Sequence, residues 1–527
     1  AHFGLAADFM AGFVLILPAV DVGSLDTLRL QVLELETPLQ QHRLEWQMLE
    51  AVPATDLHLL GPGLARSAAR HPFGSAAWRR AVYLAPRLGP DPQVAQGFLE
   101  AAAEISGTGH VVVTGWVASS DDALVWLQDA KGRVFSLEGA HCYLRRDVAR
   151  VVCGRFGEQA LQASFALHLQ GVQVEGSLQL MALGKEGVHE LASVACESLC
   201  CSVRDVAQWL SSHISCPRIA QEGLLEQVHL PVLAAVNTQL RRVAQSENVL
   251  WQNFGDSPAQ PRASIIVPLY GRFDFIESQM LEWVRDPAIG SSVELIYVVD
   301  DPGITEAVQT EAVALHRLYQ CPFRLAVSGR NRGYSGANNL GASQARGEVL
   351  VFLNSDAIPC GPGWVEGLCD LLHTHREFGA IGPRLLHADG GIQHAGMCFE
   401  WLPEFGIWSN QHPHAGLAPE LDPARGLTEV PAVTGACLAI SRTHFDAVEG
   451  WDTGYLIGDF EDSDLCLKLR SRGLKIGYTP DIELVHLERQ SMPLQGDASY
   501  RQQITLLNAR RHQQRWAEWL QRDGQRA

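Results

Sequence analysis

The alternation of apolar runs with helical segments between residues 263 and 353 constrains the fold more than any other feature. Four apolar runs in this region are rich in β-branched and aromatic residues, as strands buried on both faces are. They cover residues 263–268, 293–299, 323–327 and 349–353. The three intervening segments, 275–285, 305–319 and 334–345, are predicted to be helices. We therefore predict an α/β domain with a doubly wound, mostly parallel sheet.

Polar residues follow directly after three of the predicted strands. They are Pro268-Leu269-Tyr270, Asp300-Asp301 and Asn354-Ser355-Asp356. Because the carboxyl ends of the strands of a doubly wound sheet meet at one crevice, the three clusters are more informative together than alone. Taken by itself, Asp356 could simply cap the next helix.

A loop rich in glycine, asparagine and arginine covers residues 329–341. Its glycines permit close approach of the backbone to a ligand, and its arginines offer positive charge to a phosphate. The helix that follows adds the dipole of its N-terminus. The loop lacks the Gly-Lys-Ser/Thr sequence of a Walker loop and is not a GxGxxG motif, so it is weak evidence alone.

Composition limits the classes of partner. The net charge of −18 and the absence of a long basic run argue against nucleic acid and anionic membranes as broad partners. The 12 cysteines have no zinc-finger spacing, which favours reduced thiols and a cytoplasmic protein. No apolar run approaches the ~20 residues of a membrane-spanning helix, so we expect no transmembrane segment. A peripheral position at the inner membrane is the alternative.

The first half of the chain is predicted to be rich in β-structure. Short strands separated by Gly and Asp turns predict a β-sandwich module over residues 109–200. A similar pattern over 1–50 lacks the upstream strands and predicts a partial module truncated at its N-terminus, with chance similarity as the alternative. Trp116, Trp126 and Tyr143 could form a carbohydrate platform, but core packing is the commoner role.

Two segments are expected to be mainly helical linkers, 51–108 and 201–255. Pro92 in a first turn predicts a helix from Asp91 towards Glu104. The segment 255–261 contains Gly and Pro and marks the main domain boundary. The α/β domain is accordingly predicted over 262–527.

A series of short motifs runs through the C-terminal half. The motifs are Ser264–Tyr270, Val298–Asp301, Asn331–Gly341, Leu353–Asp356, Thr434–Ala436, Gly450–Asp452, Glu461–Leu465, Arg472–Gly473, His486–Ser491, Asn508 and Trp516. In content and order they resemble the motifs of family 2 glycosyltransferases with the GT-A fold. The resemblance covers about half of the chain, residues 264–516. Each motif is weak alone, whereas the ordered series is strong.

The resemblance implies a divalent cation, Mg²⁺ or Mn²⁺, on the diphosphate of a nucleotide-sugar donor. Asp356 matches the last acid of the family's DxD-type motif, and His486 is the expected second protein ligand. The first acidic position of that motif is Asn354 in this chain, which leaves more of the electrostatic role to Asp356. We therefore expect a site that is largely metal-free without nucleotide.

The resemblance also implies an inverting reaction in which Asp462 is the catalytic base. Glu461 would orient Asp462 or contact the acceptor. Adjacent acids also occur in first turns of helices because the macrodipole favours them, so this pair is ambiguous alone. Tyr270 is expected to pack on the nucleotide base, and Asp300 or Asp301 to bond the base or ribose. The expected nucleotide-sugar contacts are Pro268, Tyr270, Asp300, Asp301, Arg330, Asn331, Gly333, Asn339, Asn354 and Ser355.

Residues 386–431 fit the family pattern least. Four histidines lie there, but their spacings match no compact metal site. They are His387, His394, His412 and His414. We expect an acceptor-binding insert or a mobile lid.

We expect an enzyme that transfers a sugar from a nucleoside-diphosphate donor to a hydroxyl of a glycan or glycoprotein. Bacterial surface-polysaccharide assembly or protein glycosylation is the expected setting, by family analogy alone. The alternative is a carbohydrate-binding or scaffold protein with a catalytically idle GT-A domain, which Asn354 and the β-modules would favour. A nucleotidyltransferase is disfavoured because its Gly-rich signature and lysine are absent near the first strand. Oligomerisation through the β-modules is left open.

Overall fold

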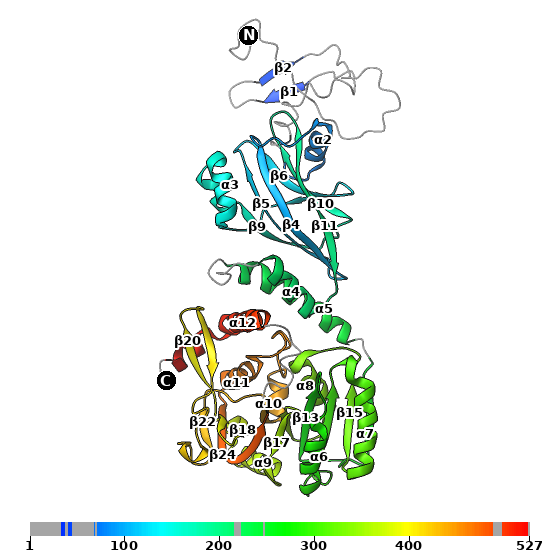
Figure 1. Cartoon of the computed structure of the whole chain (residues 1–527), viewed down its shortest axis with the longest axis vertical. Coiled ribbons are helices and arrows are strands. Elements are labelled where there is room, and N and C mark those ends of the chain that lie inside the picture. Colours follow the sequence, from blue (N-terminus) through cyan, green and yellow to red (C-terminus); the bar gives the residue numbers. More distant parts are fainter. Residues whose placement is uncertain are drawn as a thin grey trace. The chain divides into compact units, whose positions relative to one another are not determined.

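A computed structural model describes residues 33–36, 41–44, 68, 71–214, 223–245, 248–487 and 498–524. The chain forms two compact units, Ala1–Cys200 and Cys201–Ala527 (Figure 1). The partial module predicted over 1–50 lies almost wholly outside the described residues. Within it, only the hairpin β1 (Leu33–Glu36) and β2 (Gln41–Leu44) is described.

The first unit is built on a sheet of nine described strands in the order β7-β6-β10-β11-β4-β5-β9-β8, with β3 beside β11. The strands are β3 (Arg87–Leu88), β4 (Ala95–Ile105), β5 (His110–Ser119), β6 (Leu124–Asp129), β7 (Val134–Ser136), β8 (His141–Tyr143), β9 (Ser164–Gln170), β10 (Ser177–Leu183) and β11 (Val188–Leu199). The helices are α2 (Ala76–Leu84), α3 (Arg146–Phe156) and η2 (Glu158–Gln162).

This sheet curls so that its two halves face each other across one core. The strand β11 belongs to both halves, since 188–195 pairs with β10 and 196–199 with β4. Leu99 and Phe165 from one half pack in the same cluster as Leu127 and Leu180 from the other. The two halves of the predicted sandwich are therefore one continuous sheet.

The helix predicted from Asp91 to Glu104 is wrong, and over the described residues 71–108 the expected mainly helical character is wrong as well. Residues 95–105 are the strand β4, which pairs with β5 on one side and β11 on the other. Pro92 lies in a turn whose Asp91 side chain accepts a hydrogen bond from the Gln93 N–H at 2.8 Å. Pairing on both edges outweighs the helix propensity of the alanines in this segment. The core interpretation holds for Trp126 and Tyr143, both of which are buried.

The second unit contains a sheet of eleven described strands in the order β12-β15-β14-β13-β16-β23-β18-β24-β17, with β19 and β22 at its side. The strands are β12 (Leu250–Phe254), β13 (Ala263–Leu269), β14 (Val293–Val299), β15 (Phe323–Val327), β16 (Val349–Leu353), β17 (Ala357–Pro359), β18 (Phe378–Leu386), β19 (Ile392–His394), β22 (Thr428–Val430), β23 (Cys437–Ser441) and β24 (Lys475–His486). The four strands β15, β14, β13 and β16 are parallel, as predicted.

Helices cover both faces of this sheet (Figure 1). One face packs against α6 (Phe275–Arg285), α7 (Thr305–Tyr319) and α9 (Trp364–Thr374). The other face packs against α8 (Gly333–Gln344), α10 (Arg442–Ala447) and α11 (Glu461–Ser471). The doubly wound architecture predicted from the alternation is therefore confirmed. No helix in the described ranges is long and apolar enough to cross a membrane.

The remaining elements surround one end of the sheet. They are the helices α4 (Val203–His213), η3 (Leu225–His229), α5 (Leu230–Gln245), η4 (Pro302–Ile304), η5 (Pro419–Leu421) and α12 (Ala498–Gly524), and the hairpin β20 (Cys398–Leu402) and β21 (Ile407–Gln411). The hairpin packs on α12. The helices α4 and α5 were expected in a linker but belong to this second unit. Residues 250–254, also placed in that linker, form the edge strand β12 because they pair with β15.

Candidate active site

A cavity of about 1190 Å³ opens at the carboxyl ends of the parallel strands. It brings together predicted site residues from both ends of the α/β domain. They are Pro268, Tyr270, Asp300, Arg330, Asn331, Gly333, Asn339, Asn354, Ser355, Asp356, Glu461, Asp462 and His486. Asp301 is the one predicted site residue that does not line this cavity. Its carboxylate accepts hydrogen bonds from the Gly271 N–H at 3.1 Å and the Gly303 N–H at 2.8 Å, which hold the loop after β13.

Asp356 and His486 meet because β17 pairs antiparallel with the end of β24. The Nε2 atom of His486 lies 3.2 Å from Oδ1 of Asp356 and 3.3 Å from Nδ2 of Asn354. On the other side of the ring, Nδ1 lies 2.7 Å from Oε1 of Gln393. The amide nitrogen of Gln393 donates to the His486 carbonyl at 3.2 Å, which fixes Oε1 as the acceptor.

The contacts of His486 are those expected of a histidine that binds a metal ion. Because Gln393 accepts the Nδ1 proton, the neutral ring of His486 has its lone pair on Nε2, the nitrogen that faces the Asp356 carboxylate. Two electron-rich atoms at this distance favour a cation between them, and an orienting partner on the second ring nitrogen is typical of ligating histidines. The described residues contain no group of three or more potential metal ligands. Asp356 and His486 therefore leave most of the coordination positions of Mg²⁺ or Mn²⁺ to other oxygens, such as those of a diphosphate.

Glu461 and Asp462 begin α11 and line the same cavity. Asp462 accepts hydrogen bonds from the Gly435 N–H at 3.1 Å and the Ser463 N–H at 2.7 Å. Glu461 is 8% exposed, and its Oε2 atom has no hydrogen-bond partner among the described residues.

These different surroundings act differently on the pKa values of the Glu461 and Asp462 carboxyl groups. Burial raises the pKa of Glu461 well above its usual range, and the neighbouring charge of Asp462 raises it further. Burial also raises the pKa of Asp462, but its two backbone N–H donors counteract that effect. The raised pKa of Glu461 favours its neutral form, and the two N–H donors favour a negative charge on Asp462 over one on Glu461. Both acids lie in the first turn of α11, where the macrodipole favours them, and Glu461 is buried while Asp462 is half-buried.

The loops after β14 and β15 line the cavity and are held by hydrogen bonds to the backbone. Asp300 is buried and accepts the Arg332 N–H at 2.8 Å, while burial raises its pKa well above the usual range. Asn331 accepts the Gly333 N–H at 2.7 Å, and Gly333 has a φ of 70°, which glycine adopts without strain. Asn339 lines the cavity, but its amide is engaged by the Trp451 backbone, at 3.0 Å to N and 2.9 Å to O.

The segment 386–431 contributes residues to the cavity lining. His412, Asn410 and Met397 line it, and His412 is within electrostatic range of Asp462, whose pKa it lowers. The ring of His412 lies 3.1 Å from that of His394, Nδ1 to Nδ1. His394 is fully buried, and burial holds its pKa well below the usual value. Part of the segment 386–431 thus lies at the cavity, next to Asp462.

Residues 264–406 match the family model "Glycosyl transferase family 2". This segment is a family 2 glycosyl transferase domain. It contains β13 to β20, including Asp356, and the match ends before α11. The family recognised from the ordered motifs is therefore confirmed.

The curated relatives resemble this half of the chain. "Uncharacterized protein y4gI" of Sinorhizobium fredii is 32% identical over 47% of this chain and 26% of its own length. "O-antigen biosynthesis protein RfbC" of Myxococcus xanthus is 28% identical over 44% of this chain and 18% of its own length. "N-acetylglucosaminyl-diphospho-decaprenol L-rhamnosyltransferase" of Mycobacterium tuberculosis is 26% identical over 37% of this chain and 69% of its own length. The chain thus spans about a quarter or less of the first two relatives.

Several lining residues of the glycosyl transferase cavity were not predicted from the sequence. Arg204 on α4 and Asn237 and Arg241 on α5 form one wall. Asn237 donates a hydrogen bond to the Thr453 carbonyl at 2.5 Å, which joins α5 to the loop before α11. The sequence contains no signal for this wall, because a helical pattern does not indicate which other segment the helix covers.

Proposed function

We propose that this chain is an inverting, metal-dependent glycosyltransferase that moves a sugar from a nucleoside-diphosphate donor to a hydroxyl of a glycan or glycoprotein. One observation supports it above all. The pair Asp356 and His486, which could hold a metal ion, and Asp462, whose carboxyl oxygens accept two backbone N–H bonds, line the same cavity. Displacement of a diphosphate by a hydroxyl needs charge stabilisation at the leaving group and a base at the nucleophile.

The donor side would bind the diphosphate. A divalent cation on Asp356 and His486 would neutralise the charge that develops on the departing diphosphate. Gln393 keeps His486 in the orientation and tautomer that this requires. The N-terminus of α8 after Gly333 adds backbone N–H groups and a favourable dipole for phosphate oxygens.

The acceptor side would activate the hydroxyl. Asp462 takes the hydroxyl proton as the acceptor oxygen forms its bond to the anomeric carbon and the bond to the diphosphate breaks. Attack from the face opposite the leaving group inverts the anomeric configuration. The Gly435 and Ser463 N–H groups hold the negative charge on Asp462 before the reaction. Glu461, kept neutral by burial, can donate its proton in a hydrogen bond to the acceptor.

The biological setting is proposed on weaker grounds. The name of the Myxococcus relative mentions O-antigen biosynthesis, and that of the Mycobacterium relative mentions a rhamnosyltransferase acting on a lipid diphosphate. We propose synthesis of a bacterial surface polysaccharide or protein glycosylation in the cytoplasm, with a peripheral position at the inner membrane as the alternative.

A thermal-shift screen of UDP-, GDP- and dTDP-sugars, with and without Mn²⁺, tests the donor class. A donor at a hundred times its dissociation constant stabilises the folded state by about 2.7 kcal/mol, which a melting curve resolves. We expect one nucleotide to raise the melting temperature only with the metal, and His486→Gln to remove that dependence. As a matched control, the exposed Asp446→Asn on α10 should behave as wild type. No metal-dependent shift with any nucleotide would contradict the enzyme and favour the idle scaffold.

A further inference from the structure

The loop that leads into Glu461 and Asp462 has an unusual backbone. Ile457, Asp459 and Phe460 have φ angles of 63°, 89° and 70°. They are half of the six non-glycine residues with positive φ in the described part of the chain. A β-branched residue such as Ile457 rarely adopts this conformation, because its Cβ substituents clash with the backbone. Such a conformation persists only where its surroundings impose it, and it concentrates at functional sites.

Asn508 on α12 holds this loop by three hydrogen bonds. Its Oδ1 accepts the Leu456 N–H at 2.9 Å, and its Nδ2 donates to the carbonyls of Leu456 at 2.9 Å and Gly458 at 3.0 Å. The Asn508 side chain is 1% exposed, and all three of these hydrogen bonds go to the loop. One turn earlier, Thr505 donates to the Asp459 carboxylate at 2.8 Å.

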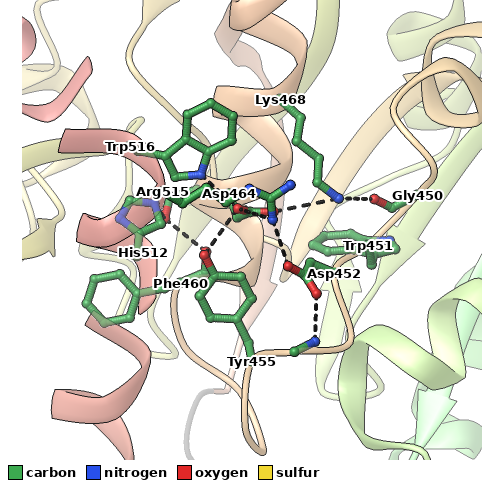
Figure 2. Close-up of polar contacts among 12 residues, drawn as sticks. Gly450, Trp451, Asp452, Tyr455, Phe460, Asp464, Lys468, His512, Arg515 and Trp516 are labelled. Carbon is green, nitrogen blue, oxygen red and sulfur yellow. Dashed lines mark hydrogen bonds and ion pairs between the residues drawn. The ribbon is translucent and has the colours of Figure 1, made fainter. Parts of the chain in front are cut away.

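The same helix also holds the start of α11 (Figure 2). Trp516 donates from Nε1 to the buried Asp464 carboxylate at 2.7 Å, and the Tyr455 hydroxyl donates to the same oxygen at 3.1 Å. His512 lies 3.1 Å from the Ser463 hydroxyl. The backbone of α12 leaves helical geometry at Trp516, with φ −122° and ψ 19°, at the residue that makes the contact to Asp464. The loop and the helix that carry the two acids are thus attached to α12 on both sides of them.

We propose that Asn508 is a positioning residue of the acceptor side: it imposes the positive φ angles of Ile457, Asp459 and Phe460 and so places Glu461 and Asp462 in the cavity. The effect of Asn508 on catalysis rests on the proposed function. The restraint of the loop by Asn508 can be measured whether or not that function is correct. A displacement of about 1 Å at a reacting group can lower the rate about a hundredfold. Loss of the three hydrogen bonds should therefore reduce turnover and leave the donor side unchanged.

Hydrogen–deuterium exchange of the full-length chain tests the restraint directly. We expect Asn508→Ala to raise amide exchange about tenfold or more in 456–464 and to leave β13, β14 and β16 unchanged. Asp523→Asn is the matched control, because it breaks a buried ion pair of the same helix, with Arg470 at 2.5 Å, on the far side from the loop. Unchanged exchange of 456–464 in Asn508→Ala, or an equal increase in Asp523→Asn, would overturn the proposal.

Nucleoside-diphosphate release from the donor found in the thermal-shift screen tests the catalytic consequence. Asn508→Ala should lower kcat about tenfold to a hundredfold, with the donor KM and Mn²⁺-dependent nucleotide binding unchanged, whereas Asp523→Asn should keep kcat. Because glycine adopts positive φ freely, Ile457→Gly should recover part of the loss in Asn508→Ala. Strictly additive effects, or a loss in donor binding equal to that in kcat, would contradict positioning. If wild type turns over no donor, the proposed function fails, and the exchange experiment still decides whether Asn508 restrains the loop.

Discussion

Replacement of Asn354 by aspartate should convert a weak metal site into a strong one. The amide nitrogen of Asn354 lies 3.3 Å from Nε2 of His486, so an aspartate there adds a carboxylate oxygen beside the Asp356–His486 pair. A unit charge at about 4 Å interacts with another by about 4 kcal/mol at an effective dielectric constant of about 20. A metal on Nε2 of His486 also displaces the N–H that Asn354 donates there in the wild type, so the absence of this bond in the variant does not reduce the gain. Screening by solvent in the open cavity does reduce it, and about 3 kcal/mol corresponds to roughly a hundredfold tighter binding of Mn²⁺ to the nucleotide-free protein.

Titration calorimetry with Mn²⁺ alone measures this affinity. Asn331→Asp is the matched control, since it adds the same charge to the cavity lining but away from His486, and should change the affinity by less than threefold. Both variants must retain the wild-type melting temperature within a few degrees. Equal or weaker Mn²⁺ binding by Asn354→Asp than by wild type would refute the assignment of Asp356 and His486 as the metal pair. Tight binding of Mn²⁺ by the wild-type protein without nucleotide would refute the expectation of a largely metal-free site.

Two further predictions concern the partners of the site. Gln393→Leu removes the acceptor of the His486 Nδ1 proton and should weaken Mn²⁺-dependent nucleotide binding about tenfold to a hundredfold, measured by calorimetry; an unchanged affinity would show that Gln393 does not orient the ring. Glu461→Gln should raise the melting temperature at pH 7. Because the pKa of Glu461 is raised in the folded state, the folded protein holds a proton that the unfolded chain releases as pH rises above about 4.3, so stability falls with pH over that range. The variant should lose this dependence between pH 4.5 and pH 7 in thermal melts, and a lower melting temperature at pH 7 would contradict a neutral Glu461.

The fold of the glycosyl transferase half was predictable because its strands are buried on both faces. An uninterrupted apolar run such as Val349–Leu353 can pair only inside a covered sheet, and the helices between such runs then have to lie on its two faces. The location of the site was also predictable from the parallel strands. Parallel strands end at one edge, so Pro268, Asp300 and Asp356 had to lie near one another.

The remainder depended on tertiary pairing that local pattern does not encode. The strand β4 contains three consecutive alanines and reads as a helix, and only its neighbours β5 and β11 make it a strand. Asn339 was expected to contact the donor, whereas its amide is occupied by the backbone of Trp451. The hydrogen bonds around Asp464, at the buried face of α11, join residues more than 50 positions apart. The periodicity of a sequence gives no indication of such distant contacts.

The comparison of wild type with Asp462→Asn tests the central claim most directly. Asparagine keeps the shape of the side chain but cannot take the acceptor proton. With the donor and Mn²⁺ saturating, we predict that release of the nucleoside diphosphate falls at least a hundredfold while the donor-induced thermal shift is retained. Release by Asp462→Asn at the wild-type rate would remove Asp462 as the base and contradict the mechanism proposed for this cavity.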